Sequence, residues 1–302
     1  MKVAACRYEV GRPADFDAFA ARQRALLGEV AAQGVRVAVL PEYLSLELAA
    51  MFPPAVHADL HASLQAIQPL RSAWLDLFAT LARQTGMYIA AGSFLLAGGT
   101  GRYRNRTDVF APDGRHQWQD KLQLTGFEKQ AGVIEPGDAL KVLDLDGVRA
   151  GVSICYDSEF PLPVRAQYEA GARLLLVPSC TDTEAGATRV RVGCLARALE
   201  NRFFVAQAVT AGEAPWSPAL DANTGDAAIY APMDVGFPAD GVLARAGAGQ
   251  AWAIAELDFA QLEATRGTAQ VANDRDWQGQ LAPSVVRARV GEFVATSAAE
   301  GG

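Results

Sequence analysis

The chain has 302 residues, of which half are hydrophobic and a fifth are charged, a composition typical of globular proteins with a large core. Its 34 acidic residues outnumber 27 lysines and arginines, which gives a formal net charge of −7. An extended surface for nucleic acid or for an anionic membrane is therefore not expected.

Cysteines and terminal segments predict a soluble cytoplasmic protein. The four cysteines are scattered and form no CxxC pair, so a disulfide framework is not expected and a reducing compartment is favoured. The first residues are interrupted by charge too early for a signal peptide. No apolar run approaches the ~20 residues that span a bilayer.

Strand and helix patterns alternate along the chain. A strand at residues 3–8 precedes an amphipathic helix at 15–34. The strands expected after it lie at residues 35–40, 87–96, 107–110, 116–124, 140–145, 149–155, 174–177, 203–209, 228–230 and 252–257. The helices lie at 60–85 (one or two), 163–171 and 187–202, and the glycine-rich residues 98–101 predict a hairpin turn.

This alternation has no linker and no change in composition, so it predicts one α/β domain over residues 1–294. The strands are almost continuously apolar, which indicates a sheet covered on both faces. Residues 295–302 are small and polar, and we expect a frayed tail there.

Cys155 ends an apolar run and is followed by a polar turn and Pro161. We expect the thiol at the carboxyl end of a buried strand, beside a helix N-terminus that favours the thiolate. A cysteine in such a position is a candidate nucleophile. It then needs a base to accept its proton and donors to bind the oxyanion.

Two polar residues at predicted strand positions are candidates for those roles. Glu42 follows the strand at 35–40, and desolvation there would raise its pKa and suit it as a base. Lys121 lies in a strand-like run and offers a fixed positive charge. A loop carboxylate and an exposed strand lysine are equally reasonable interpretations of these two residues.

Other candidate residues have weaker patterns. His57 and His61 are four apart without a third ligand, so we expect a solvated helix face and no metal site. Cys180 follows a strand and is expected to line a pocket with Thr181 and Asp182, although Asp182 could instead cap the next helix. For the arginines of the helix at 187–202, namely Arg189, Arg191 and Arg197, we expect ion pairing or solvent exposure.

The residues around these candidates resemble the nitrilase superfamily of carbon–nitrogen hydrolases, in its amidase-like branch. The resemblance lies in Leu40-Pro41-Glu42-Tyr43, in Asp120-Lys121-Leu122-Gln123-Leu124 and in the segment from Cys155 to Pro161, and it extends to the stretch from Arg197 to Arg202. The three motifs occur in the family's order over residues 3–257. The resemblance implies a four-layer αββα sandwich.

The resemblance also implies roles for these residues. Glu42 would be the general base, Lys121 the oxyanion stabiliser and Cys155 the attacking thiol, with the backbone N–H of Tyr156 as a second oxyanion donor. No cofactor or metal is implied. The family's second glutamate is best matched by Glu128, with Glu135 as a competitor and a purely structural carboxylate as an equal alternative. The surrounding loop departs from the family pattern, since Gln123 stands where histidine is common.

The implied activity is hydrolysis of a small linear amide, with ammonia or an amine released from an acyl-thioester. Nitrile hydrolysis by the same three residues, acyl transfer to an amine and a non-catalytic dimeric binding scaffold are alternatives. The expected partner is a small-molecule amide or nitrile. The resemblance further implies a homodimer or larger homo-oligomer, for which the helix at 187–202 is our candidate interface.

Overall fold

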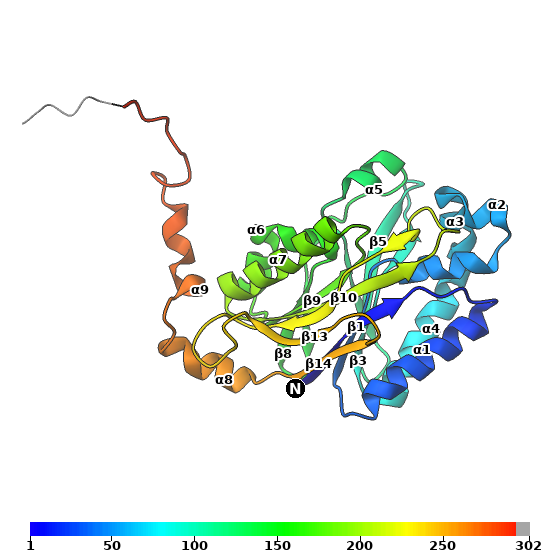
Figure 1. The fold of residues 1–302 in the computed structure, drawn as a ribbon, viewed down its shortest axis with the longest axis horizontal. Helices are drawn as coiled ribbons and strands as arrows, with labels where there is room; N and C mark the ends of the chain where they lie inside the picture. Colours follow the sequence, from blue (N-terminus) through cyan, green and yellow to red (C-terminus); the bar gives the residue numbers. More distant parts are fainter. Residues whose placement is uncertain (294–302) are drawn as a thin grey trace, which may run out of the picture.

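The computed structural model describes residues 1–293, and its strands are hydrogen-bonded into one curled sheet (Figure 1). The main strand order is β4-β5-β3-β2-β1-β10-β9-β8-β7, with the remaining strands attached to β1, β5 and β10 and to each other. The strands are β1 (Lys2–Glu9), β2 (Val37–Leu40), β3 (Tyr88–Ala91), β4 (Phe94–Ala97), β5 (Tyr103–Phe110), β6 (His116–Asp120), β7 (Val142–Leu145), β8 (Val148–Val152), β9 (Leu174–Ser179), β10 (Phe204–Glu213), β11 (Ala222–Asn223), β12 (Ala227–Tyr230), β13 (Val242–Ala246) and β14 (Trp252–Glu256).

Strand β1 divides this sheet into two halves. Its first residues pair in parallel with β2 and antiparallel with β14, whereas Arg7 to Glu9 pair in parallel with β10. The two halves lie against each other, because β2 contacts β9 and β10 without pairing with either strand. The parallel strands β2, β9 and β10 thus end close together.

Helices cover the outer face of each half of the sheet. Helices α1 (Phe16–Ala31) and α4 (Arg71–Thr85) lie beside β1 and β3, and α6 (Pro161–Glu169) and α7 (Glu184–Asn201) lie over β8, β9 and β10 (Figure 1). Helix α1 buries Phe19, Leu27 and Val30 on one face, as its apolar spacing predicts. The predicted αββα sandwich is therefore confirmed.

The remaining helices are short and lie mostly in the connections. They are α2 (Pro54–His57), α3 (Leu60–Ile67), α5 (Gly126–Ala131), α8 (Phe259–Ala264) and α9 (Asn273–Asp276), with 3-10 turns η1 (Leu44–Met51), η2 (Gln68–Leu70), η3 (Cys155–Glu159), η4 (Thr265–Gly267) and η5 (Trp277–Leu281). After α8 the chain leads away from the sheets (Figure 1). None of the helices within residues 1–293 is long and apolar enough to cross a membrane.

Several boundaries differ from the predictions. The helical stretch at 60–85 divides at η2, where Pro69 interrupts it. The strand predicted at 87–96 divides into β3 and β4 at Gly92, whose φ of 66° and close approach to the Pro41 carbonyl exclude a side chain. The hairpin turn at residues 98–101 joins β4 to β5 as predicted. The tail at 295–302 lies outside the described residues, so the domain limit at residue 294 stays a prediction.

Candidate active site

Glu42 lies two residues beyond the end of β2, after Pro41, and its side chain is buried. Two contacts fix the backbone at this point. Thr210 Oγ1 of β10 donates to the Glu42 carbonyl at 2.8 Å, and the Tyr43 N–H donates to Ser93 Oγ at 2.8 Å. The carboxylate is therefore held inside the sandwich, where the two sheet halves meet.

Lys121 follows directly after β6, and its side chain is 1% exposed. Its ammonium donates to Glu42 Oε1 at 2.7 Å and lies 2.9 Å from Glu128 Oε2. The backbone N–H of Lys121 donates to the Asn105 carbonyl of β5 at 2.8 Å. An exposed strand lysine is thus the wrong interpretation, and β6 ends at Asp120 rather than at residue 124.

Glu128 is the second carboxylate that the structure brings to Lys121. It lies on α5, where it forms a capping box with Thr125. Tyr43 Oη donates to Glu128 Oε1 at 2.8 Å, so both carboxylate oxygens have partners. Glu135, the competing glutamate, instead accepts from Arg104 Nε at 2.9 Å and lies apart from Lys121.

The two carboxylates around Lys121 have opposite pKa shifts. Burial raises the pKa of Glu42, and the neighbouring Glu128 raises it further, although Lys121 opposes the shift. Burial alone would also raise the pKa of Glu128, but Lys121 and the N–H of Thr125 hold it below its usual value. When the surroundings separate the pKa values of two neighbouring acids, the acid with the raised pKa is suited to exchange protons and the acid with the lowered pKa is suited to remain ionised. Here these are Glu42 and Glu128, respectively.

Burial by itself would lower the pKa of Lys121, yet Glu42 and Glu128 raise it above its usual value. Lys121 therefore remains an ammonium. Such an ion has three N–H donors, and the two carboxylates occupy two of them.

Cys155 begins the turn η3, three residues after β8 ends. Its backbone has a φ of 50°, in the left-handed region that a non-glycine residue adopts rarely and at a cost. The side chain is buried, and Sγ donates to the Cys180 carbonyl at 3.4 Å. The predicted order of strand, polar turn and helix is present, because η3 separates β8 from α6, which begins at Pro161.

The surroundings of the thiol oppose the expected thiolate. Burial raises the pKa of the Cys155 thiol well above its usual value, and the nearby Glu42 carboxylate raises it further. The Lys121 ammonium opposes both effects. The thiol therefore needs a base to accept its proton.

Asp157 connects the cysteine turn to the lysine loop. Its carboxylate accepts the N–H of Ile154 before Cys155, and the N–H groups of Leu122 and Gln123 after Lys121, at 2.7 to 3.2 Å. Burial raises the pKa of Asp157 to about 6, against the opposing effect of these N–H groups. One buried side chain thus fixes the distance between the two segments.

A pocket of about 270 Å³ opens onto these groups. Glu42, Lys121 and Cys155 line its inner part. Tyr156 and the predicted pocket residues Cys180, Thr181 and Asp182 line it as well. The suggested helix cap at Asp182 is wrong, because Thr183 Oγ1 accepts the N–H of Gly186 and caps α7.

The sequence profile of the carbon–nitrogen hydrolases matches residues 2–266, a span that includes Glu42, Lys121 and Cys155. The chain belongs to the carbon–nitrogen hydrolase family. It is therefore an enzyme of the hydrolase class, and the resemblance to the nitrilase superfamily is confirmed.

Relatives of this carbon–nitrogen hydrolase include the probable hydrolase YhcX of Bacillus subtilis, 26% identical over 278 residues, or 91% of this chain and 53% of YhcX. The chain thus spans about half the length of that relative. Omega-amidase NIT2-B of Xenopus laevis is 25% identical over 83% of this chain and 86% of its own length.

Solved structures share the fold. Nit3 of Saccharomyces cerevisiae, a nitrilase-superfamily member, has a TM-score of 0.71 and 21% identity over 91% of this chain and 96% of its own. An amidase from Nesterenkonia sp. has a TM-score of 0.67 and 22% identity over 92% of this chain and 96% of its own.

Sequence reasoning missed three residues that support this site in the hydrolase. Tyr43 and Asp157 were seen only as parts of motifs, and Asn105 not at all. Asn105 Nδ2 donates to Glu42 Oε1 at 2.8 Å from the middle of β5. Its signal is a polar residue at a buried position of an alternating strand.

One further prediction, on the two histidines, needs correction. His57 is buried, ends α2 and has its Nδ1 2.9 Å from the Trp216 carbonyl, whereas His61 belongs to α3, so no shared solvated face exists. The expected ion pairing of the helix arginines is present at Arg197, which is buried, lies 2.9 Å from Glu200 Oε1 and also donates to the Ser158 carbonyl at 3.3 Å. Arg189 is exposed but lines the pocket of the hydrolase beside Glu159.

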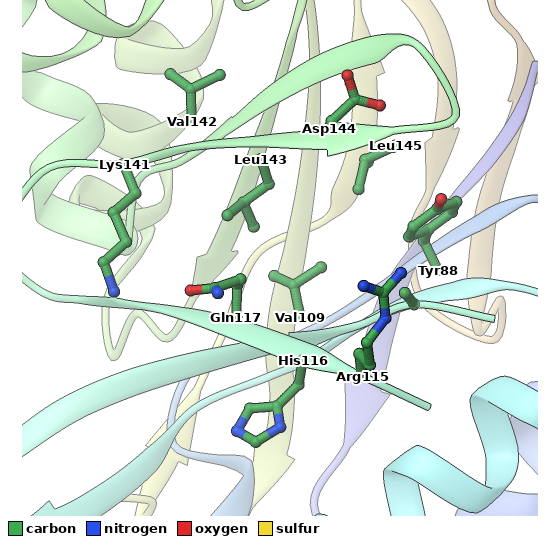
Figure 2. A pocket seen from close by; sticks show the side chains of 11 residues that line it. Tyr88, Val109, Arg115, His116, Gln117, Lys141, Val142, Leu143, Asp144 and Leu145 are labelled. Carbon is green, nitrogen blue, oxygen red and sulfur yellow. The ribbon is translucent and has the colours of Figure 1, made fainter. Parts of the chain in front are cut away.

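A larger hollow, of about 780 Å³, lies among β5, β6 and β7 (Figure 2). Val109, Leu143 and Leu145 line it, and the Lys141 ammonium at its edge lies 3.7 Å from the centroid of the Trp118 ring. Glu42, Lys121 and Cys155 are all outside its lining. The chemically equipped site of this hydrolase is therefore the smaller pocket.

Proposed function

We propose that this enzyme hydrolyses the C–N bond of a small linear amide through an acyl-thioester on Cys155. The observation that carries the proposal is the convergence of Glu42, Lys121 and Cys155 in one pocket. The names of two relatives, an omega-amidase and an amidase, agree with it. The volume of about 270 Å³ lies below the usual range for drug-sized ligands, which favours a small substrate.

The first half of the reaction forms the thioester. Glu42 accepts the thiol proton, and Cys155 Sγ attacks the amide carbonyl carbon while the C=O electron pair moves onto oxygen. The third N–H of the Lys121 ammonium and the backbone N–H of Tyr156 donate to this oxyanion. When the C–N bond breaks, Glu42 returns the proton to the departing nitrogen, and ammonia or an amine leaves.

The second half releases the acid. Glu42 accepts a proton from a water molecule whose oxygen attacks the thioester carbon, and the same donors hold the new oxyanion. The C–S bond then breaks, the Cys155 sulfur takes back the proton and the carboxylic acid leaves. Glu128 remains ionised throughout and holds Lys121 in place.

The test is ammonia release together with intact mass spectrometry on wild type and Cys155→Ala, using a panel of small amides and nitriles. We expect ammonia and an acyl adduct with amides in the wild type and neither in the variant. Cys6→Ala is the matched control, because Cys6 is a buried thiol in β1 outside the pocket. Its adduct should match that of the wild type.

Three results would redirect the proposal. Turnover of nitriles alone would make the enzyme a nitrilase. Hydroxylamine that outcompetes water for the acyl adduct would indicate an acyltransferase. An unreactive Cys155, with no ammonia from any compound, would support a binding scaffold instead.

A further inference from the structure

The mouth of the pocket carries an uneven set of charges. Glu159, Asp182 and Asp221 line it, together with a single guanidinium, that of Arg189. These residues come from three separate elements: the turn η3, the N-terminal end of α7 and the loop before β11. The excess of carboxylates therefore arises only where the folded chain brings these three elements together.

The guanidinium at the mouth already has a partner. Arg189 Nε lies 3.7 Å from Glu159 Oε1, and burial raises the pKa of Glu159 against the opposing effect of Arg189. Within residues 1–293, neither Asp182 nor Asp221 forms a salt bridge, and both are exposed at the pocket surface. Two carboxylates thus face the pocket without a neutralising group.

The inner pocket does not compensate for this excess. Among the residues that line the whole pocket, the four carboxylates of Glu42, Glu159, Asp182 and Asp221 face only the cations of Lys121 and Arg189. Lys121 is itself held between Glu42 and Glu128. A cleft lined by one sign of charge focuses its potential on the ligand and raises the local concentration of the opposite ion.

We infer that the substrate amide carries a cationic group, a protonated amine or a guanidinium, at the end far from its carbonyl. This inference rests on the proposed function. Asp182 and Asp221 bind the cation while the carbonyl lies at Cys155. An amide with a carboxylate at that end would be repelled by these two aspartates. The one cation at the mouth that could attract it, Arg189, already pairs with Glu159.

The test compares three amides of similar length: 5-aminopentanamide, which is cationic, hexanamide, which is neutral, and glutarate monoamide, which is anionic. We expect kcat/KM for the cationic amide to exceed that for hexanamide by up to about fivefold, the size of effect that an exposed ion pair supplies. The anionic amide should be the poorest substrate. Added salt should narrow the differences, since the mouth is exposed.

The double variant Asp182→Asn/Asp221→Asn should reduce the ratio of cationic to neutral kcat/KM to about one, mainly through KM. Asp76→Asn is the matched control, because Asp76 is an exposed carboxylate on α4 outside the pocket. It should leave the ratio unchanged. Equal rates for the three amides in the wild type, or a preference for the anionic amide that Arg189→Gln abolishes, would overturn the inference.

Binding of the same three compounds to Cys155→Ala by calorimetry separates this inference from the proposed function. Tighter binding of 5-aminopentanamide supports the cationic preference even where no amide is hydrolysed. Equal or weaker binding contradicts the preference even where amides are hydrolysed.

Discussion

Replacing Glu128 by glutamine tests whether the second carboxylate acts on the chemistry or only on the fold. The carboxylate accepts from Tyr43 Oη, from the Thr125 N–H at 2.9 Å and from Lys121 at 2.9 Å. An amide keeps the shape but has one acceptor oxygen and no charge. At least one of the three donors must lose its acceptor or change orientation.

The structure gives the size of the effect. One poorly matched buried donor costs about 1–3 kcal/mol, so the free energy of unfolding should fall by that amount in Glu128→Gln. Full loss of an oxyanion donor costs ~100- to 1,000-fold in rate. Lys121 remains bound to Glu42, so kcat/KM should fall less, by about 10- to 100-fold.

The pH profile distinguishes the two roles of Glu128. Its negative charge raises the pKa of Glu42, so neutralising it lowers that pKa. The acidic limb of kcat/KM, which reports the base in the free enzyme, should therefore move to lower pH in the variant. Ammonia release from pH 4 to 9 and urea unfolding measure the two effects.

Glu135→Gln is the matched control. Glu135 bonds to Thr100 and Arg104 away from Lys121, so the same substitution there should leave the rate and the acidic limb unchanged. A variant Glu128→Gln that unfolds more easily but keeps its rate and its acidic limb would refute our reasoning and make Glu128 a structural residue.

Further predictions concern pH, the lysine and assembly. Burial raises the folded-state pKa of Asp157 to about 6, so the stability that this group contributes falls as pH rises from about 4 to 6. The urea midpoint of Asp157→Asn should therefore decline less than that of the wild type over this pH range. Equal declines in the two proteins would contradict this prediction. Lys121→Met should lower kcat by at least ~100-fold in ammonia-release assays while a folded protein remains by circular dichroism; near-normal turnover would exclude an oxyanion role. Leu162 and Val192 are exposed on the neighbouring helices α6 and α7. If these helices form the dimer interface, the double variant Leu162→Asp/Val192→Asp should be a 32.0 kDa monomer when measured by light scattering. A monomeric wild type would contradict the predicted interface.

The apolar patterns predicted most of the sheet, whereas the joint action of Glu42 and Lys121 was implied by the resemblance to the nitrilase superfamily. The sheet follows from a local rule, because continuous apolar runs form covered strands. The position of Lys121 does not, because it was predicted within a strand and lies beyond the end of β6. The strand β2 before Glu42 is fully buried, as its composition predicts. The choice between Glu128 and Glu135 depended instead on how the chain turns at α5, which no periodicity describes.

The residues that support the site could not be predicted from such rules, because their roles depend on partners that are far away in the sequence. Asn105 and Glu42 are 63 residues apart, and Asp157 accepts from residues 34 and 35 positions earlier. The strand before Cys155 was predicted too long for a similar reason. Its mostly small and apolar residues continue to Ile154. In the structure the backbone N–H of Ile154 donates a hydrogen bond to the Asp157 carboxylate, and the chain turns after β8.

The left-handed backbone of Cys155 sets folding against chemistry at a single position. A side chain in that conformation costs about 1–2 kcal/mol, which glycine would avoid. The backbone at residue 155 alone would therefore favour glycine, whereas the proposed thioester requires a sulfur there. The turn η3 thus combines backbone strain and the proposed nucleophile in one residue, as functional sites often do.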